Sequence, residues 1–178
     1  MDSTERDSLA RKLVEVAYLE GDFILASGRH SRYYFDKYRF ETQPDLLRPV
    51  GQLIAERVPS GTNRIAGPEL GAVALAAAAS LSSGVPFVIV RGGHKAYGTG
   101  QQIEGIYEKG ESVVVVEDVM TSGGSAIEAA RVLVEAGCQV RKIIAVIDRE
   151  EGARDAVTAA GFELDPLFTR TELDRWLK

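Results

Sequence analysis

The chain of 178 residues contains few of the features that mark secreted, membrane or nucleic-acid-binding proteins. Its single cysteine, Cys138, excludes a disulfide within the chain, so a cytoplasmic location is expected. The longest apolar runs, such as residues 72–79 and 113–116, are far shorter than the roughly 20 residues that cross a membrane. The polar, acidic first residues do not resemble a secretory signal peptide.

Basic charge is also scarce. The formal net charge is −5, and no run of Lys or Arg indicates a nucleic-acid-binding surface. Two common phosphate-binding sequences are absent: a P-loop, and a Gly-x-Gly-x-x-Gly fingerprint after a strand. A phosphate group would therefore have to be bound by local geometry and not by overall charge.

What the chain does have is the composition of one globular domain, with 45% hydrophobic and 26% charged residues. Apolar strands separated by helices predict an α/β fold with a mainly parallel sheet covered on both faces. The expected strands are residues 33–35, 64–66, 86–90, 113–116 and 140–147, and the expected helices are residues 4–19, 44–58, 72–82, 124–136, 150–160 and 171–178.

One segment does not fit this alternation. Residues 92–110 are rich in glycine and contain few apolar side chains. Long segments of this kind inside a compact domain are usually functional, often as lids over a site.

The strongest functional signal is residues 113–125, which read VVVVEDVMTSGGS. Four valines predict a buried strand, and open α/β sheets bind ligands at the carboxyl ends of their strands. The small residues of the following loop allow backbone N–H groups to surround a phosphate at a helix N-terminus. Glu117 and Asp118 would repel that phosphate, so they suit the two vicinal hydroxyls of a ribose whose 5′-phosphate lies in the loop. The alternative is a solvated acidic turn followed by a Ser or Thr helix cap.

This segment resembles the phosphoribosyl diphosphate motif of the type I phosphoribosyltransferases. Four further segments are similar to those of orotate phosphoribosyltransferases, in the same order along the chain. They are residues 23–36 (FILASGRHSRYYFD), 67–71 (GPELG), 91–98 (RGGHKAYG) and 148–151 (DREE).

The resemblance implies transfer of a phosphoribosyl group to orotate, with Mg²⁺ held mainly through the substrate and no direct protein ligand to the metal. It also implies one domain over residues 1–178, in which about residues 1–40 and the C-terminal end form a hood and residues 92–110 a mobile loop. A homodimer with shared active sites is implied, because the family's loop lysine acts in the neighbouring subunit.

The resemblance also implies the roles of individual residues. Lys95, Glu117 and Asp118 would be catalytic, and orotate would be bound by Tyr34, Phe35, Thr121 and Arg149. Phosphoribosyl diphosphate would be bound by Arg91, Lys95, Tyr97, Glu117, Asp118, Val119, Met120, Thr121, Ser122, Gly123, Gly124 and Ser125.

The chain departs from the family where Ala26, Gly71 and Gly92 stand in place of lysines that members often carry, and where Tyr97 replaces a histidine. Cationic contacts to diphosphate are therefore fewer than expected. Two other functions remain open at this point: transfer to another base, and a non-catalytic regulator that senses phosphoribosyl diphosphate.

Overall fold

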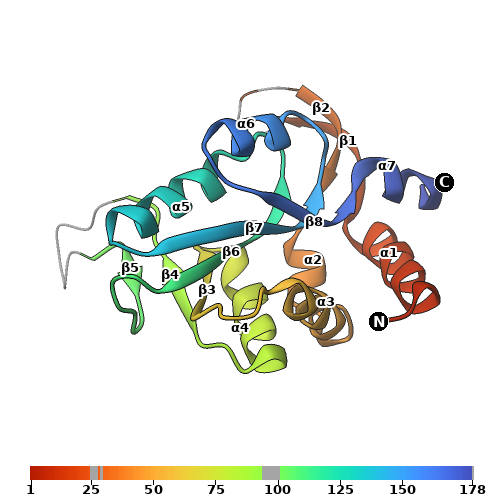
Figure 1. Ribbon diagram of the computed structural model, residues 1–178. Helices are drawn as coiled ribbons and strands as arrows, with labels where there is room; N and C mark the ends of the chain where they lie inside the picture. The colour runs from red at the N-terminus through yellow and green to blue at the C-terminus, as the bar shows by residue number, and fades with distance from the viewer. Residues whose placement is uncertain (25–27, 29, 94–100, 178) are drawn as a thin grey trace.

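The computed structural model describes residues 1–24, 28, 30–93 and 101–177, and a six-stranded sheet forms its centre (Figure 1). Its strands are β3 (Arg64–Pro68), β4 (Phe87–Val90), β5 (Ile103–Glu104), β6 (Ser112–Met120), β7 (Gln139–Asp148) and β8 (Leu164–Thr169). They lie in the order β5-β4-β3-β6-β7-β8, and every neighbouring pair is parallel except β4 and β5. The predicted α/β fold with a mainly parallel sheet is confirmed.

Helices cover both faces of the sheet, as predicted. Figure 1 shows α5 (Gly124–Glu135) and α6 (Ala153–Ala159) above it, and α3 (Pro44–Arg57) and α4 (Ala72–Ser83) below it. Each pair of helices contributes to a separate apolar core. The sheet is therefore buried on both sides.

Strand β6 shows why the valine run suits this position. Val114 and Val116 belong to the core that contains α3 and α4, whereas Val113 and Val115 belong to the core that contains α5. Successive side chains of a strand point to opposite faces, so a continuous apolar run fits a strand that is covered twice.

The N-terminal residues form a further layer beside the C-terminal end of the chain (Figure 1). A two-stranded antiparallel sheet joins β1 to β2, and Arg6 of α1 donates to the carbonyl of Leu167 at 2.6 Å. This layer contains the residues expected to form the hood, whose role stays a prediction. Its elements are α1 (Ser3–Ala17), β1 (Tyr18–Ile24), β2 (His30–Phe35), α2 (Tyr38–Glu41), α7 (Arg170–Leu173) and the 3₁₀ turn Asp174–Trp176.

Several expected boundaries were wrong. Strand β6 continues to Met120, so the acidic pair lies inside the strand, with Glu117 opposite Ala145 of β7. Strand β1 was missed because its middle is polar, and β8 was missed because it contains Pro166, which is tolerated on this edge of the sheet. The glycine-rich segment is not structureless throughout, since β5 pairs with β4 there. Within the described part of the chain, no helix is long and apolar enough to span a membrane.

Candidate active site

The acidic pair lies near the carboxyl end of β6 and is almost completely buried. Glu117 is 8% exposed and Asp118 4% exposed. Lys37, which stands between β2 and α2, donates to Asp118 Oδ2 at 2.7 Å. Glu117 accepts a hydrogen bond from the Asp118 backbone through Oε1, while its buried Oε2 has no partner. A buried carboxylate oxygen without a partner is costly, so it suits a ligand that donates a hydrogen bond.

The loop after β6 turns sharply into α5. Gly123 has φ of +81° and stands at the N-cap of the helix without any side-chain cap. A Cβ atom there would lie 3.2 Å from Met120 Cε and 3.3 Å from Val157 Cγ2. The turn therefore needs glycine for its backbone conformation. The uncapped N–H groups at the start of α5 are suited to an anion.

Arg149 follows β7 and lies beside the end of β6, where its N–H donates to the carbonyl of Met120 at 2.9 Å. Its guanidinium group is 2% exposed and pairs with Glu151 at 2.7 Å. It also donates to Ser31 Oγ and to Tyr33 Oη, each at 3.3 Å, and lies 4.4 Å from the centre of the Tyr33 ring. These contacts hold a planar cation in a fixed orientation at one side of the site.

These parts of the chain meet around one hollow of about 410 Å³. Strand β2, the end of β6, the loop into α5 and the end of β7 all contribute to it. The lining includes every expected site residue of the described chain except Arg91. The complete lining consists of Tyr34, Phe35, Lys37, Glu117, Asp118, Val119, Met120, Thr121, Ser122, Gly123, Gly124, Ser125 and Arg149.

Burial changes the electrostatics of this hollow. Burial, reinforced by the negative charge of Asp118, raises the pKa of Glu117 well above its ordinary value. The same two causes raise the pKa of the neighbouring Glu41 to about 8. For Lys37, burial acts to lower the pKa, but the ion pair with Asp118 outweighs it and the pKa is raised. Near neutral pH the cluster thus carries less negative charge than its number of carboxyl groups suggests, which favours an anionic ligand.

One expected residue of the described chain, Arg91, does not line the hollow. Arg91 follows β4 and forms ion pairs with Glu69 at 3.3 Å and with Glu104 at 3.8 Å. Lys95 and Tyr97 lie outside the described residues. Their predicted roles therefore stay predictions.

Sequence reasoning missed several residues of the site. Lys37 and Tyr33 directly contact expected site residues, and Glu41 adds a buried carboxyl group. Tyr33 stands within the expected strand of residues 33–35, but it was not among the expected site residues. Lys37 is 81 positions from its partner Asp118, so spacing along the chain offered no signal.

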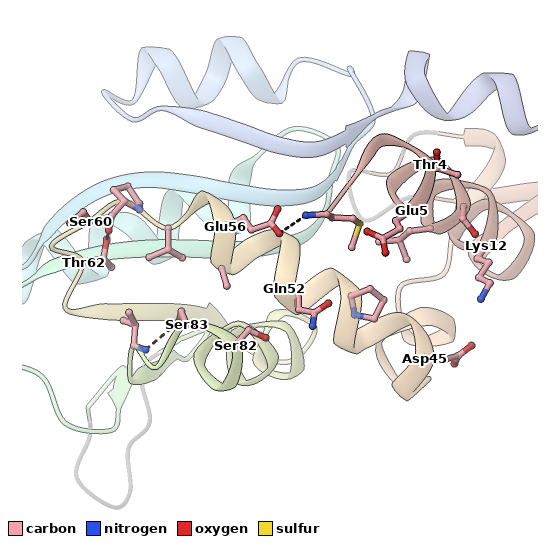
Figure 2. A pocket seen from close by; sticks show the side chains of 18 of the residues that line it. Thr4, Glu5, Lys12, Asp45, Gln52, Glu56, Ser60, Thr62, Ser82 and Ser83 are labelled. Carbon is pink, nitrogen blue, oxygen red and sulfur yellow. Dashed lines mark hydrogen bonds and ion pairs between the residues drawn. The ribbon is translucent and has the colours of Figure 1, made fainter.

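A larger hollow lies elsewhere, between α1, α3 and the end of α4 (Figure 2). It measures about 1030 Å³, and its labelled charged side chains are of mixed sign. Figure 2 shows these side chains spread along separate elements, with Glu56 paired to the N-terminal amine at 2.8 Å. The arrangement offers no group of residues suited to catalysis.

The carboxyl groups of the site can be tested for metal binding. Over the described ranges, no group of three or more His, Cys, Asp or Glu side chains is arranged to hold a metal ion. Glu117 and Asp118 do supply hard carboxylate oxygens, one of which has no partner. The residues therefore fit Mg²⁺ that takes most of its ligands from a phosphorylated substrate.

Known proteins share this architecture. A family model described as phosphoribosyl transferase domain matches residues 39–163. An orotate phosphoribosyltransferase of Methanocella arvoryzae is 50% identical over 153 residues, which cover 86% of this chain and 87% of that protein. The solved orotate phosphoribosyltransferase of Aeropyrum pernix has a TM-score of 0.82 at 32% identity, covering 94% of this chain and 96% of that one.

A second solved structure carries a ligand. The orotate phosphoribosyltransferase of Mycobacterium tuberculosis in complex with 5-phospho-α-D-ribosyl 1-diphosphate has a TM-score of 0.80 at 28% identity. The match covers 96% of this chain and 99% of that one. Together with the acid pair, the uncapped loop and the buried arginine, these similarities show that the chain belongs to the orotate phosphoribosyltransferase family.

Proposed function

We propose that this protein transfers the phosphoribosyl group of 5-phosphoribosyl 1-diphosphate to orotate, in pyrimidine biosynthesis. The observation that carries the proposal is the single hollow in which a buried acid pair, an uncapped glycine turn and a buried arginine meet. Each part suits one portion of the reactants: ribose hydroxyls, 5′-phosphate and the orotate carboxylate. The named relatives support the same reaction.

The substrate contacts follow from the chemistry of each side chain. Glu117 and Asp118 accept hydrogen bonds from the ribose hydroxyls, and the N–H groups of residues 121–125 bind the 5′-phosphate. Arg149 presents a planar pair of donors to the orotate carboxylate. Thr121 and the aromatic residues Tyr34 and Phe35 line the space for the pyrimidine ring.

In the reaction, N1 of orotate forms a bond to the anomeric carbon on the face opposite diphosphate, so the configuration inverts. The bond from that carbon to diphosphate breaks, its electron pair leaves with diphosphate, and the proton of N1 passes to the departing diphosphate or to water. The transition state has oxocarbenium character, and the site must therefore stabilise departing diphosphate more than it must activate a nucleophile. The buried acid pair accepts hydrogen bonds from the ribose hydroxyls and so holds the ring in place while the positive charge develops.

Mg²⁺ belongs to this proposal. It would be held mainly by diphosphate and ribose oxygens, with Glu117 and Asp118 as the nearest protein oxygens. When bound, it neutralises negative charge on the leaving diphosphate.

The remaining parts of the proposal concern the diphosphate side and the assembly. Arg91, Lys95 and Tyr97 would contact diphosphate, with Lys95 reaching the site of a second subunit in a cytoplasmic homodimer. Arg91 would have to exchange its present carboxylate partners for the ligand.

A phosphoribosyltransferase for another base is the second candidate. The hydrogen-bonded and buried Arg149 argues against it, because adenine, hypoxanthine and uracil carry no carboxylate to pair with a buried guanidinium group. A regulator that only senses phosphoribosyl diphosphate would have no use for this arginine either.

The proposal is tested by following loss of orotate absorbance on addition of phosphoribosyl diphosphate and Mg²⁺. Adenine, hypoxanthine and uracil are assayed in parallel as rival acceptors. We expect turnover with orotate alone. Consumption of a purine would identify the second candidate, and tight binding of phosphoribosyl diphosphate without turnover of any base would identify the regulator.

A further inference from the structure

Lys37 is a residue of the active site that the reaction scheme has not yet used. It lies in the short connection between β2 and α2, and its side chain lines the hollow next to the acid pair. The Lys37 side chain is 27% exposed, whereas the side chain of Asp118, its partner at 2.7 Å, is 5% exposed. A partly exposed lysine on a flexible stem can change partner without leaving the site.

The backbone at Gly71, just before α4, lies directly against this ammonium group. A Cβ atom built on Gly71 would be 2.5 Å from Lys37 Nζ and 2.8 Å from Lys37 Cε, and would overlap Asp118 Oδ2. Any side chain at position 71 is therefore incompatible with the Lys37–Asp118 pair as it stands. Lys37 occupies the space that a side chain at position 71 would need.

Charge around the hollow is distributed unevenly. Of the described residues that line it, Lys37 and Arg149 carry positive charge, and Arg149 already forms an ion pair with Glu151. Arg91 is placed between two carboxylates outside the lining. Among the described residues, Lys37 is thus the cation that lines the hollow beside the acid pair and Gly71.

We propose that Lys37 binds the diphosphate group of the substrate and stabilises it as it leaves, exchanging Asp118 for diphosphate when the ribose hydroxyls reach Asp118. The inference rests on the proposed function, because it takes the ligand to be phosphoribosyl diphosphate.

The exchange is balanced in charge and hydrogen bonds. Without substrate, Lys37 neutralises the buried carboxylate of Asp118. With substrate, the ribose hydroxyls donate to Asp118, and the ammonium group turns to the more highly charged diphosphate beside it.

The test compares Lys37→Met, which keeps the length of the stem but removes the charge, with Lys37→Arg, which keeps the charge. Lys37→Gln is a second neutral variant that can still donate to Asp118. Lys142→Met is the matched control, since it breaks another lysine–aspartate pair of 2.7 Å, with Asp165, away from the site. Thermal unfolding establishes that each variant is folded.

Calorimetry measures the affinity of each variant, with Mg²⁺ present, for phosphoribosyl diphosphate, inorganic diphosphate and ribose 5-phosphate. Loss of one charge-assisted contact should weaken binding of the first two ligands by about tenfold to a hundredfold in Lys37→Met and Lys37→Gln. Ribose 5-phosphate, which lacks the diphosphate, should bind about as it does to the unmodified protein. Lys37→Arg should recover most of the affinity, and Lys142→Met should lose none.

Two results would overturn the inference. One is unchanged binding of both diphosphate ligands by the neutral variants. The other is an equal loss for ribose 5-phosphate, which would mean that Lys37 only positions Asp118. The proposed function is judged separately, by orotate turnover in the unmodified protein, so either idea can fail without the other.

Discussion

At the scale of single residues, Arg149 shows how a buried charge is prepared for a ligand. Its guanidinium group already has Ser31, Tyr33 and Glu151 as partners. Under the proposed function, the orotate carboxylate would join this network with little loss of side-chain entropy, because the arginine is held in place beforehand.

Replacing Arg149 distinguishes the binding of orotate from the binding of phosphoribosyl diphosphate. We expect Arg149→Ala to lower kcat/KM for orotate at least about a hundredfold, since a carboxylate loses its paired donors. Affinity for phosphoribosyl diphosphate should change by less than about threefold. The control is Arg141→Ala, which removes an arginine at the opposite end of the same strand, where it contacts Ser112. Equal weakening of both ligands would indicate a collapsed site.

Glu41 provides a prediction on pH. Burial and the negative charge of Asp118 raise its pKa from 4.5 to about 8, while Lys37 opposes the shift and Glu117 and Asp36 add to it. Between about pH 4.5 and 8, Glu41 therefore keeps its proton in the folded protein but has lost it in the unfolded chain. Within this window, the contribution of Glu41 to stability falls as the pH rises.

We therefore expect Glu41→Gln, which is neutral at every pH, to melt higher than the unmodified protein at pH 8.5, by on the order of 5 °C. The difference should shrink as the pH falls and should vanish near pH 5. Melting curves across this range measure it. Glu128→Gln, on the exposed face of α5, should show no such trend. A difference that stays constant with pH would contradict the assignment of the raised pKa to Glu41.

At the scale of elements, the turn between β6 and α5 is the segment that we propose binds the 5′-phosphate. Its conformation depends on Gly123, which has φ of +81° and neighbours within 3.3 Å of a would-be Cβ. Gly161, after α6, has φ of +87° but open space around it. The two positions share a backbone penalty and differ in whether they belong to the site.

This pair allows a controlled test. Gly123→Ala and Gly161→Ala should each lose about 1 kcal/mol of stability, because alanine is strained at positive φ. Only Gly123→Ala should bind ribose 5-phosphate more weakly, by about tenfold or more, since its turn has to shift. Calorimetric titrations on both variants decide the point. Similar affinities for the two variants would show that the turn does not bind the phosphate.

The elements also show where prediction from sequence succeeds. Long periodic segments such as α3 and the valine strand were recognised, because local composition and burial agree there. Strand β5 was missed because it has only two residues, and β8 because it contains Pro166, and each pairs with a neighbour in the sheet. Pairing between distant segments leaves no local pattern to read.

At the scale of the whole molecule, the proposed dimer makes a quantitative prediction. Lys95 should act in the partner's site and Asp118 in its own, so Lys95→Ala and Asp118→Asn chains should each be inactive alone. After random exchange at equal amounts, half of the dimers are mixed, and each contains one intact site. Activity should then recover to about a quarter of the unmodified level.

Steady-state rates after mixing measure this recovery, with subunit exchange verified on tagged chains. Mixing two batches of the Asp118→Asn chain serves as the control and should restore nothing. Activity that stays absent despite exchange would mean that Lys95 does not act across subunits. A monomer in sedimentation under assay conditions would contradict shared sites altogether.

The order of residues along the chain was enough to predict the parallel sheet, the acid pair and the glycine-containing turn after it, whereas Arg149 was named through the family resemblance. All of these lie within one short segment or at the end of one strand, where local patterns and sheet rules apply. The contacts that complete the site join distant residues: Lys37 meets Asp118 across 81 positions, and Arg149 meets Tyr33 across 116. Only tertiary packing brings such residues together, because burial of the sheet on both faces, and not sequence spacing, determines which side chains share the hollow.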